Sequence, residues 1–137
     1  MGTLIASDSL KMQLESVGSR IQPGKGTFLF RRGDGVSGVH LVVSGQIRLG
    51  LDRDPRGFPS RVLGAGSVLG LPATLSDSPS GLTAEVMEDS ELVFVPADKL
   101  RQLLRDQPQL CFDVMSILTE ELNQTRTPLE RLHKPGA

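Results

Sequence analysis

Short runs in which apolar and polar side chains alternate recur along the chain between residues 28 and 94. In one of them, Ile47 and Leu49 are separated by Arg48. Successive side chains of a strand point to opposite faces of a sheet, so this alternation predicts half-buried strands. The runs that predict strands are residues 28–30, 39–43, 46–51, 82–87 and 92–94.

Turn-forming residues separate these runs. Combinations of Gly with Pro, Asp or Ser stand at 23–24, 33–35, 44–45 and 54–57, and Gly-Ala-Gly stands at 64–66. The polar segment 52–59, which contains Pro and Gly, is interpreted as an exposed hairpin tip. Many short strands joined by such turns are typical of an antiparallel sandwich or jelly roll.

Helical periodicity replaces the alternation before and after the strands. Ser7 or Asp8 can cap a short helix that Gly18 ends. The apolar positions of this helix are Leu10, Met12, Leu14 and Val17. The predicted order of elements is therefore a helix, a β-barrel and two further helices.

The two later helices follow Pro96. Leucine spacing predicts one helix over 97–106 and a longer one over 108–126. Pro108 suits the first turn of the longer helix. Pro128 disfavours helical backbone at the residue before it, so we expect the helix to end near Arg126.

The longer helix carries two apolar stripes. One stripe with a 4-3-4-3 spacing consists of Cys111, Met115, Leu118, Leu122 and Thr125, and the other consists of Leu110, Val114 and Ile117. Together they form an apolar arc wider than one contact needs. We expect one stripe to pack on the barrel and the other to meet a partner helix, which predicts a homodimer through the 108–126 helix. The dimer seam would consist of Cys111, Met115, Leu118 and Leu122. The alternative is a helix buried on both sides within one domain.

The composition is that of one globular domain without a marked charge. The chain has 137 residues, with 38% hydrophobic and 23% charged residues, and a formal net charge of -1. This balance does not indicate a nucleic-acid partner. Cys111 is the single cysteine, so no disulfide forms within one chain. No apolar run approaches the ~18 residues of a membrane span, and no signal peptide is recognisable, so we expect a cytoplasmic protein without membrane contact.

Residues that could carry chemistry are few. His40 lies on a predicted strand with no nucleophile beside it, and a structural role is favoured over catalysis. Acidic residues lack ligand spacing for a metal. A haem sensor with His40 or Cys111 as ligand has no supporting residues in the sequence. We therefore predict no enzymatic activity, no metal and no cofactor. The turn at 66–75 could hold an anion on its backbone amides, although glycines at barrel corners usually serve geometry.

Several motifs resemble the cyclic-nucleotide-binding domain of the Crp/Fnr superfamily over most of residues 10–127. They are Phe30-Arg31-Arg32-Gly33-Asp34, Val42-Val43-Ser44-Gly45, the Gly66 to Gly70 segment, Pro79 and Thr83-Ala84. The resemblance implies a mainly β fold with flanking helices. This fold is a double-stranded β-helix, or jelly roll, with one N-terminal helix and two C-terminal helices. It also implies a sensor domain over 1–127, which leaves 128–137 as a terminal tail.

In that family a loop and short helix called the phosphate-binding cassette contact the nucleotide. A Glu directly after the cassette glycine binds the ribose 2′-hydroxyl, and an Arg directly after its proline pairs with the phosphate. Here Leu71 follows Gly70 and Ser80 follows Pro79. Leucine accepts no hydrogen bond and serine cannot neutralise a phosphate, so we expect weak binding of cyclic AMP.

The resemblance places candidate ligand contacts on the cassette and on the long helix. The cassette positions are Gly70, Leu71, Pro72, Ala73, Ser80, Gly81, Leu82 and Thr83. Thr125 falls where the family's long helix offers a hydroxyl to the base, although it is interpreted equally well as a residue of the dimer seam.

The sequence thus predicts a sensor or regulatory domain for an unidentified small-molecule effector that is not cyclic AMP. One alternative is a true cyclic-nucleotide signalling domain that uses backbone amides and serines. Another is the effector half of a transcription regulator whose helix-turn-helix is absent. The residues after the long helix are too few for such a module, and charges balance between 97 and 137. We therefore expect no DNA binding by this chain alone.

Overall fold

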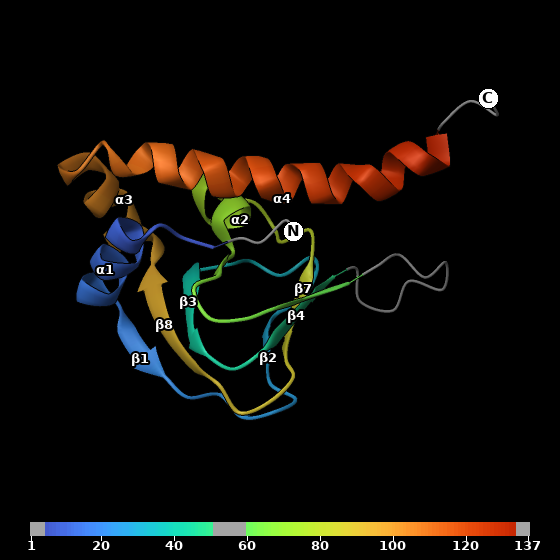
Figure 1. Cartoon of the computed structure of the whole chain (residues 1–137), viewed down its shortest axis with the longest axis horizontal. Helices are drawn as coiled ribbons and strands as arrows, with labels where there is room; N and C mark the ends of the chain where they lie inside the picture. The colour runs from blue at the N-terminus through green and yellow to red at the C-terminus, as the bar shows by residue number, and fades with distance from the viewer. Residues whose placement is uncertain (1–4, 51–59, 134–137) are drawn as a thin grey trace.

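The computed structural model describes residues 5–50 and 60–133, and from residue 122 onward it describes the backbone only. Figure 1 shows a β-barrel with α1 and α3 at one end and α4 lying across the top. The predicted hairpin tip at 52–59 lies outside the described residues. The elements are α1 (Asp8–Val17), β1 (Ser19–Ile21), β2 (Phe28–Phe30), β3 (Gly38–Ser44), β4 (Ile47–Gly50), β5 (Arg61–Leu63), β6 (Val68–Leu69), α2 (Leu71–Ser76), β7 (Thr83–Val86), β8 (Glu91–Pro96), α3 (Ala97–Asp106) and α4 (Leu110–His133).

Two four-stranded antiparallel sheets form the barrel. Their strand orders are β1-β8-β3-β6 and β2-β7-β4-β5, so strands distant in the chain become neighbours. Apolar side chains from both sheets and from α1, α3 and α4 share one core. The predicted jelly roll, with one helix before it and two after it, is confirmed.

The first helix forms as the sequence predicts. The Ser7 side chain accepts a hydrogen bond from the Leu10 amide at 3.1 Å and so caps the helix. The Gly18 amide donates to the Leu14 carbonyl at 2.9 Å at the other end. Leu10 and Leu14 are each 1% exposed and anchor α1 to the core.

Three strands have no recognisable signal in the sequence. β1, β5 and β6 are short, and their sequences, Ser-Arg-Ile, Arg-Val-Leu and Val-Leu, show no alternation of apolar and polar residues. They exist because a longer strand supplies their hydrogen-bond partners: Ser19 pairs with Phe94, Ile47 with Leu63, and Leu41 with Val68. Tertiary pairing, and not local pattern, therefore creates these strands.

The predicted end of the long helix near Arg126 is wrong. α4 begins at Leu110, after a turn that contains Pro108, and continues past Pro128 to His133. Proline inside a helix removes one hydrogen bond and costs about 3 kcal/mol, which disfavours helix without forbidding it. The residues of 128–137 up to His133 consequently extend α4 and do not form a separate tail.

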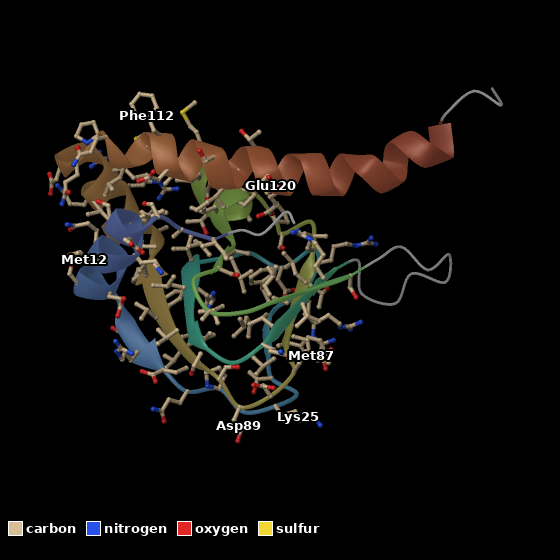
Figure 2. The ribbon with its side chains drawn as sticks, viewed as in Figure 1. Met12, Lys25, Met87, Asp89, Phe112 and Glu120 are labelled. Atoms are coloured by element: carbon tan, nitrogen blue, oxygen red, sulfur yellow. The ribbon has the colours of Figure 1, made fainter. Side chains whose placement is uncertain are left out.

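The two stripes of α4 face different surroundings. Leu110, Val114 and Ile117 are each at most 3% exposed and pack on the core. Figure 2 shows Phe112 pointing away from the barrel. The Phe112 side chain is 73% exposed and Met115 is 58% exposed. α4 thus packs on the barrel with one face and presents an apolar surface on the other.

Close packing of β3 against β8 leaves no room for a side chain at Gly38. A Cβ there would overlap the Val95 carbonyl oxygen and lie 2.9 Å from the Pro96 Cα. Gly35 has no neighbour within 4 Å of the same position. We predict that Gly38→Ala lowers the free energy of unfolding by about 1–3 kcal/mol, because the added methyl group forces the backbone at Val95 and Pro96 to move. Gly35→Ala should leave it nearly unchanged. Urea denaturation checks both, and equal effects would contradict the prediction.

Candidate ligand site

A cavity of about 260 Å³ lies between the loop-and-helix segment 70–82 and α4. Strands of the β2-β7-β4-β5 sheet supply part of its wall, and two residues of α4 close it. The lining residues are Phe30, Leu49, Gly70, Pro72, Ala73, Ser80, Gly81, Leu82, Leu118 and Glu121. Four parts of the chain that are distant in sequence therefore meet at one site.

The backbone course of this segment is fixed by Gly70. Its φ of 88° is left-handed, and a Cβ there would approach the Gly38 carbonyl oxygen to 3.2 Å. The Gly70 carbonyl accepts from the Thr74 amide at 3.1 Å and starts α2. Asp77, with a φ of 54°, ends the helix. The segment thus keeps a defined turn, helical turn and return loop.

Most of the predicted cassette positions meet at the cavity. Gly70, Pro72, Ala73, Ser80, Gly81 and Leu82 all line it. Thr83 does not, because it is 3% exposed and its hydroxyl accepts from the Arg32 amide at 2.9 Å. The side chain of Thr125 lies outside the described residues, as does that of Leu122.

Leu71 is placed differently from the prediction. We expected it to offer an apolar surface to the ligand, but it does not line the cavity and is 1% exposed within the core. The first residue of α2 is turned inward because burying a leucine side chain stabilises the fold by about 1.5–3 kcal/mol. Its role in this structure is to anchor α2.

Ser80 forms hydrogen bonds within its own loop. Its hydroxyl donates to the Leu82 carbonyl at 2.6 Å, and its oxygen accepts from the Leu82 amide at 3.1 Å. The Ser80 amide donates to the Asp34 carbonyl at 2.9 Å. The side chain is 7% exposed and carries no charge. Ser80 therefore holds the return loop to the barrel.

Glu121 is the ionisable residue of the lining, and the sequence analysis missed it. Burial raises the pKa of its carboxyl to about 7, although the nearby Arg61 guanidinium acts to lower it. Helical spacing could have found it, because Glu121 continues the buried stripe of Leu110, Val114 and Ile117. A carboxyl on the core-facing stripe of a helix is unusual enough to mark a candidate site.

Arg61 lies beside the cavity without lining it. It pairs across β4 and β5 with Leu49, which lines the wall, so the two side chains share a face of the sheet. Burial lowers the pKa of Arg61, while Glu121 and Glu120 act to raise it. Its Nη1 atom is buried without a hydrogen-bond partner among the described residues.

His40 is buried outside the cavity. Its ring centre lies 5.0 Å from that of Phe94 and 6.5 Å from that of Phe30. Burial lowers its pKa to about 4, so the imidazole is neutral. Such surroundings agree with the structural role favoured from the sequence.

Within the described ranges, no three His, Cys, Asp or Glu side chains converge on a position for a metal ion. Nor does any described helix have the length and apolar character needed to cross a membrane.

Comparison of the sequence with models of known protein families identifies the domain that contains the cavity. A family model described as the cyclic nucleotide-binding domain matches residues 21–107, which is more than half of the chain. The chain belongs to the cyclic nucleotide-binding domain family. It is a regulatory domain of Crp/Fnr type.

Among curated proteins, the anaerobic regulatory protein of Bacillus subtilis is 28% identical over 131 residues, covering 94% of this chain and 55% of the relative. A lysophospholipase of Neurospora crassa is 26% identical over 103 residues, covering 74% of this chain but 7% of that enzyme. The chain thus spans about half of the first relative and a small part of the second. The lysophospholipase is therefore similar to this chain over only a small part of its own length.

Among solved structures, the Thermus thermophilus catabolite activator protein superposes with a TM-score of 0.75 at 26% identity. The match covers 93% of this cyclic nucleotide-binding domain and 60% of the activator. It extends beyond residues 21–107 and therefore includes flanking helices as well as the barrel.

Glu121 and His40 should affect stability with opposite dependence on pH. The folded state holds the Glu121 proton more tightly than the unfolded state does. The contribution of Glu121 to the free energy of unfolding is therefore fully present below pH 4.5 and is lost as the pH rises through about 7. The folded state holds the His40 proton less tightly than the unfolded state does. The contribution of His40 to the free energy of unfolding is therefore fully present above pH 6.5 and is lost as the pH falls through about 4.

These contributions oppose each other between about pH 4.5 and pH 6.5, and single variants should separate them. In Glu121→Gln, the free energy of unfolding should rise with pH across this window. In His40→Leu, it should fall with rising pH. The slopes can reach about 1.4 kcal/mol per pH unit for one proton. Urea denaturation across the window measures them, and parallel profiles for wild type and both variants would contradict the prediction.

Proposed function

We propose that this chain is an effector-sensing domain whose cavity binds a small, mostly apolar molecule and binds cyclic AMP only weakly. The observation that carries the proposal is the ionisable group of the cavity wall, which is the carboxyl of Glu121 and not a cation. A cyclic nucleotide carries a phosphate anion, which needs a counter-charge when it leaves water. A carboxyl on the wall opposes that anion.

The hydrogen bonds of Ser80 support the same proposal. Its hydroxyl is already used by the Leu82 backbone both as donor and as acceptor. If the hydroxyl turned to a phosphate, it would leave partly buried backbone groups unsatisfied, which costs about 1–3 kcal/mol for each group. A serine used in this way does not replace the missing arginine. This argues against a nucleotide site built from serines and backbone amides.

A cyclic-nucleotide sensor with Arg61 as the counter-charge is the second candidate. The observation that favours it is the buried Nη1 atom of Arg61, which has no hydrogen-bond partner among the described residues. Against it, Arg61 does not line the cavity, and its charge is already balanced by Glu121 and Glu120. A phosphate would have to compete with two carboxylates for one guanidinium.

We propose that α4 transmits ligand binding to a partner subunit. Leu118 and Glu121 line the cavity, while Phe112 and Met115 on the same helix are exposed. A ligand that shifts the inner face of a rigid helix also shifts its outer face. The outer face would form a homodimer seam with a second copy. Leu118, assigned to the seam from sequence, contributes to the cavity as well.

A regulatory role also agrees with the relative named as an anaerobic regulatory protein. Basic and acidic residues balance between residues 97 and 137, so this part of the chain has no net positive charge to attract phosphates. We therefore propose that the domain acts on partners through protein contacts, and that DNA binding is not an activity of these residues.

Cyclic nucleotides should bind poorly to the wild-type chain. We predict dissociation constants for cyclic AMP and cyclic GMP weaker than about 1 mM, because the phosphate finds no counter-charge. Ser80→Arg should strengthen binding of both, since it restores a cation at the loop. Ser78→Arg, at an exposed position of the same loop, is the matched control and should not. Isothermal calorimetry measures all three, and low-micromolar binding by the wild type would overturn the proposal.

The exposed face of α4 should hold two chains together. We predict that Met115→Glu gives monomers, because it places a charge in an apolar seam. Met12→Glu makes the same substitution at a methionine of α1 that is 65% exposed and lies outside this face, and it serves as the control. Sedimentation velocity measures the oligomeric state. A wild-type chain that sediments as a monomer at high micromolar concentration would show that the seam does not exist.

A further inference from the structure

The polarity of the cavity wall is uneven. Phe30 of β2, Leu49 of β4, Leu82 of the loop before β7 and Leu118 of α4 supply apolar surface. Glu121 supplies a carboxyl from α4. In pockets of this kind, apolar walls provide affinity and a few polar groups select the ligand. An apolar cavity of about 150 Å³ already accommodates a benzene ring. The 260 Å³ observed here leaves room for a ring with a short polar substituent.

The charges around the cavity favour a cation. Glu121 is the one titratable group among the described lining residues. Arg61 on β5 faces it from outside the lining, and Glu120 on α4 also acts on Arg61. These three groups carry two carboxyls against one guanidinium. An incoming anion would meet a net negative environment, whereas a cation would balance it.

We propose that Glu121 is the residue that recognises the effector, and that the effector is a small, mostly apolar amine whose ammonium group binds the Glu121 carboxylate. This inference rests on the proposed function, since it assigns the ligand class of the same cavity. The ring or chain of the amine lies against Leu49, Leu82 and Leu118. A charge-assisted hydrogen bond then forms between the ammonium nitrogen and a carboxylate oxygen.

Burial of Glu121 gives this recognition a dependence on pH. Only the ionised carboxylate pairs with an ammonium, and burial raises the pKa of this group to about 7 in the empty cavity. The affinity for an amine should therefore rise about tenfold between pH 6 and pH 8, as the ionised fraction increases. A neutral alcohol should show little change. A carboxylate should bind less well as the pH rises, because it meets a second anion.

Three probes that share one ring separate these cases. Benzylamine, benzyl alcohol and benzoate are titrated into the ¹⁵N-labelled wild-type chain, and dissociation constants are taken from amide chemical shifts. We expect benzylamine to bind most tightly at pH 8 and benzoate most weakly. We also expect the shifts to include amides of α4 near Leu118. Benzoate binding equal to or tighter than that of benzylamine would overturn the inference.

Two isosteric variants test the residue itself. Glu121→Gln keeps the size of the side chain, and it should weaken benzylamine binding by about tenfold and abolish its pH dependence. Benzyl alcohol should bind this variant about as well as it binds the wild type, which shows that the cavity is intact. Glu120→Gln, one residue away and outside the lining, removes a carboxyl that acts on the cavity only through Arg61, and it should weaken benzylamine binding much less than Glu121→Gln does. Unchanged benzylamine binding by Glu121→Gln would overturn the inference.

Failure of this inference differs from failure of the proposed function. If benzyl alcohol binds in the cavity and benzylamine binds no more tightly than it does, the assignment of an amine is overturned. The proposal of a small apolar effector would still stand. Tight binding of cyclic AMP would instead overturn the proposed function, and the inference with it.

Discussion

The rest of the structure depends on the packing of one face of α4 against the barrel. Leu110, Val114 and Ile117 are almost fully buried in that contact, and they fix both the position and the rotation of the helix. Three apolar side chains of this size contribute several kcal/mol when they leave water. The helix cannot rotate without exposing them. Every residue one or two turns further along α4 is therefore held at a defined orientation, and Glu121 is among them.

This constraint explains a carboxyl in an apolar surrounding. A lone glutamate side chain would stay in water, because its charged form loses hydration on burial. Here the apolar stripe orients the helix, and Glu121 is carried to the cavity wall as the next member of the same spacing. The cost is reflected in the pKa of about 7, which Arg61 offsets only in part. A ligand with positive charge would relieve it, which ties the local electrostatics to the proposed ligand class.

In the proposed function, ligand sensing and subunit assembly share the same rigid element, α4. The inner face of α4 contacts the cavity through Leu118, and its outer face carries the exposed Phe112 and Met115. The loop that carries Ser80 is tied to the barrel by backbone hydrogen bonds to Gly33 and Asp34. A displacement at the inner face of the rigid helix would therefore be carried to its outer face. This division of roles agrees with a domain that converts ligand binding into a change at a subunit interface.

The sequence by itself determined the longer elements and the region of the site. Alternation identified β3, β4, β7 and β8, and capping at Ser7 identified α1, because these signals arise within a few consecutive residues. The glycines and the proline of the loop identified a candidate ligand segment, and most of its predicted positions line the cavity. Local chemistry was sufficient for these features.

Only the tertiary structure decided the rest. The short strands β1, β5 and β6 show no alternation of apolar and polar residues. They form because longer neighbouring strands supply their hydrogen-bond partners. Leu71 was assigned to the ligand on its place in the motif, but the helical turn directs it into the core. Glu121 stands 51 residues after Gly70 and 40 residues after Gly81, and its meeting with them depends on how α4 crosses the barrel. A sequence encodes which side chains share a helix face, whereas packing between distant elements decides what that face meets.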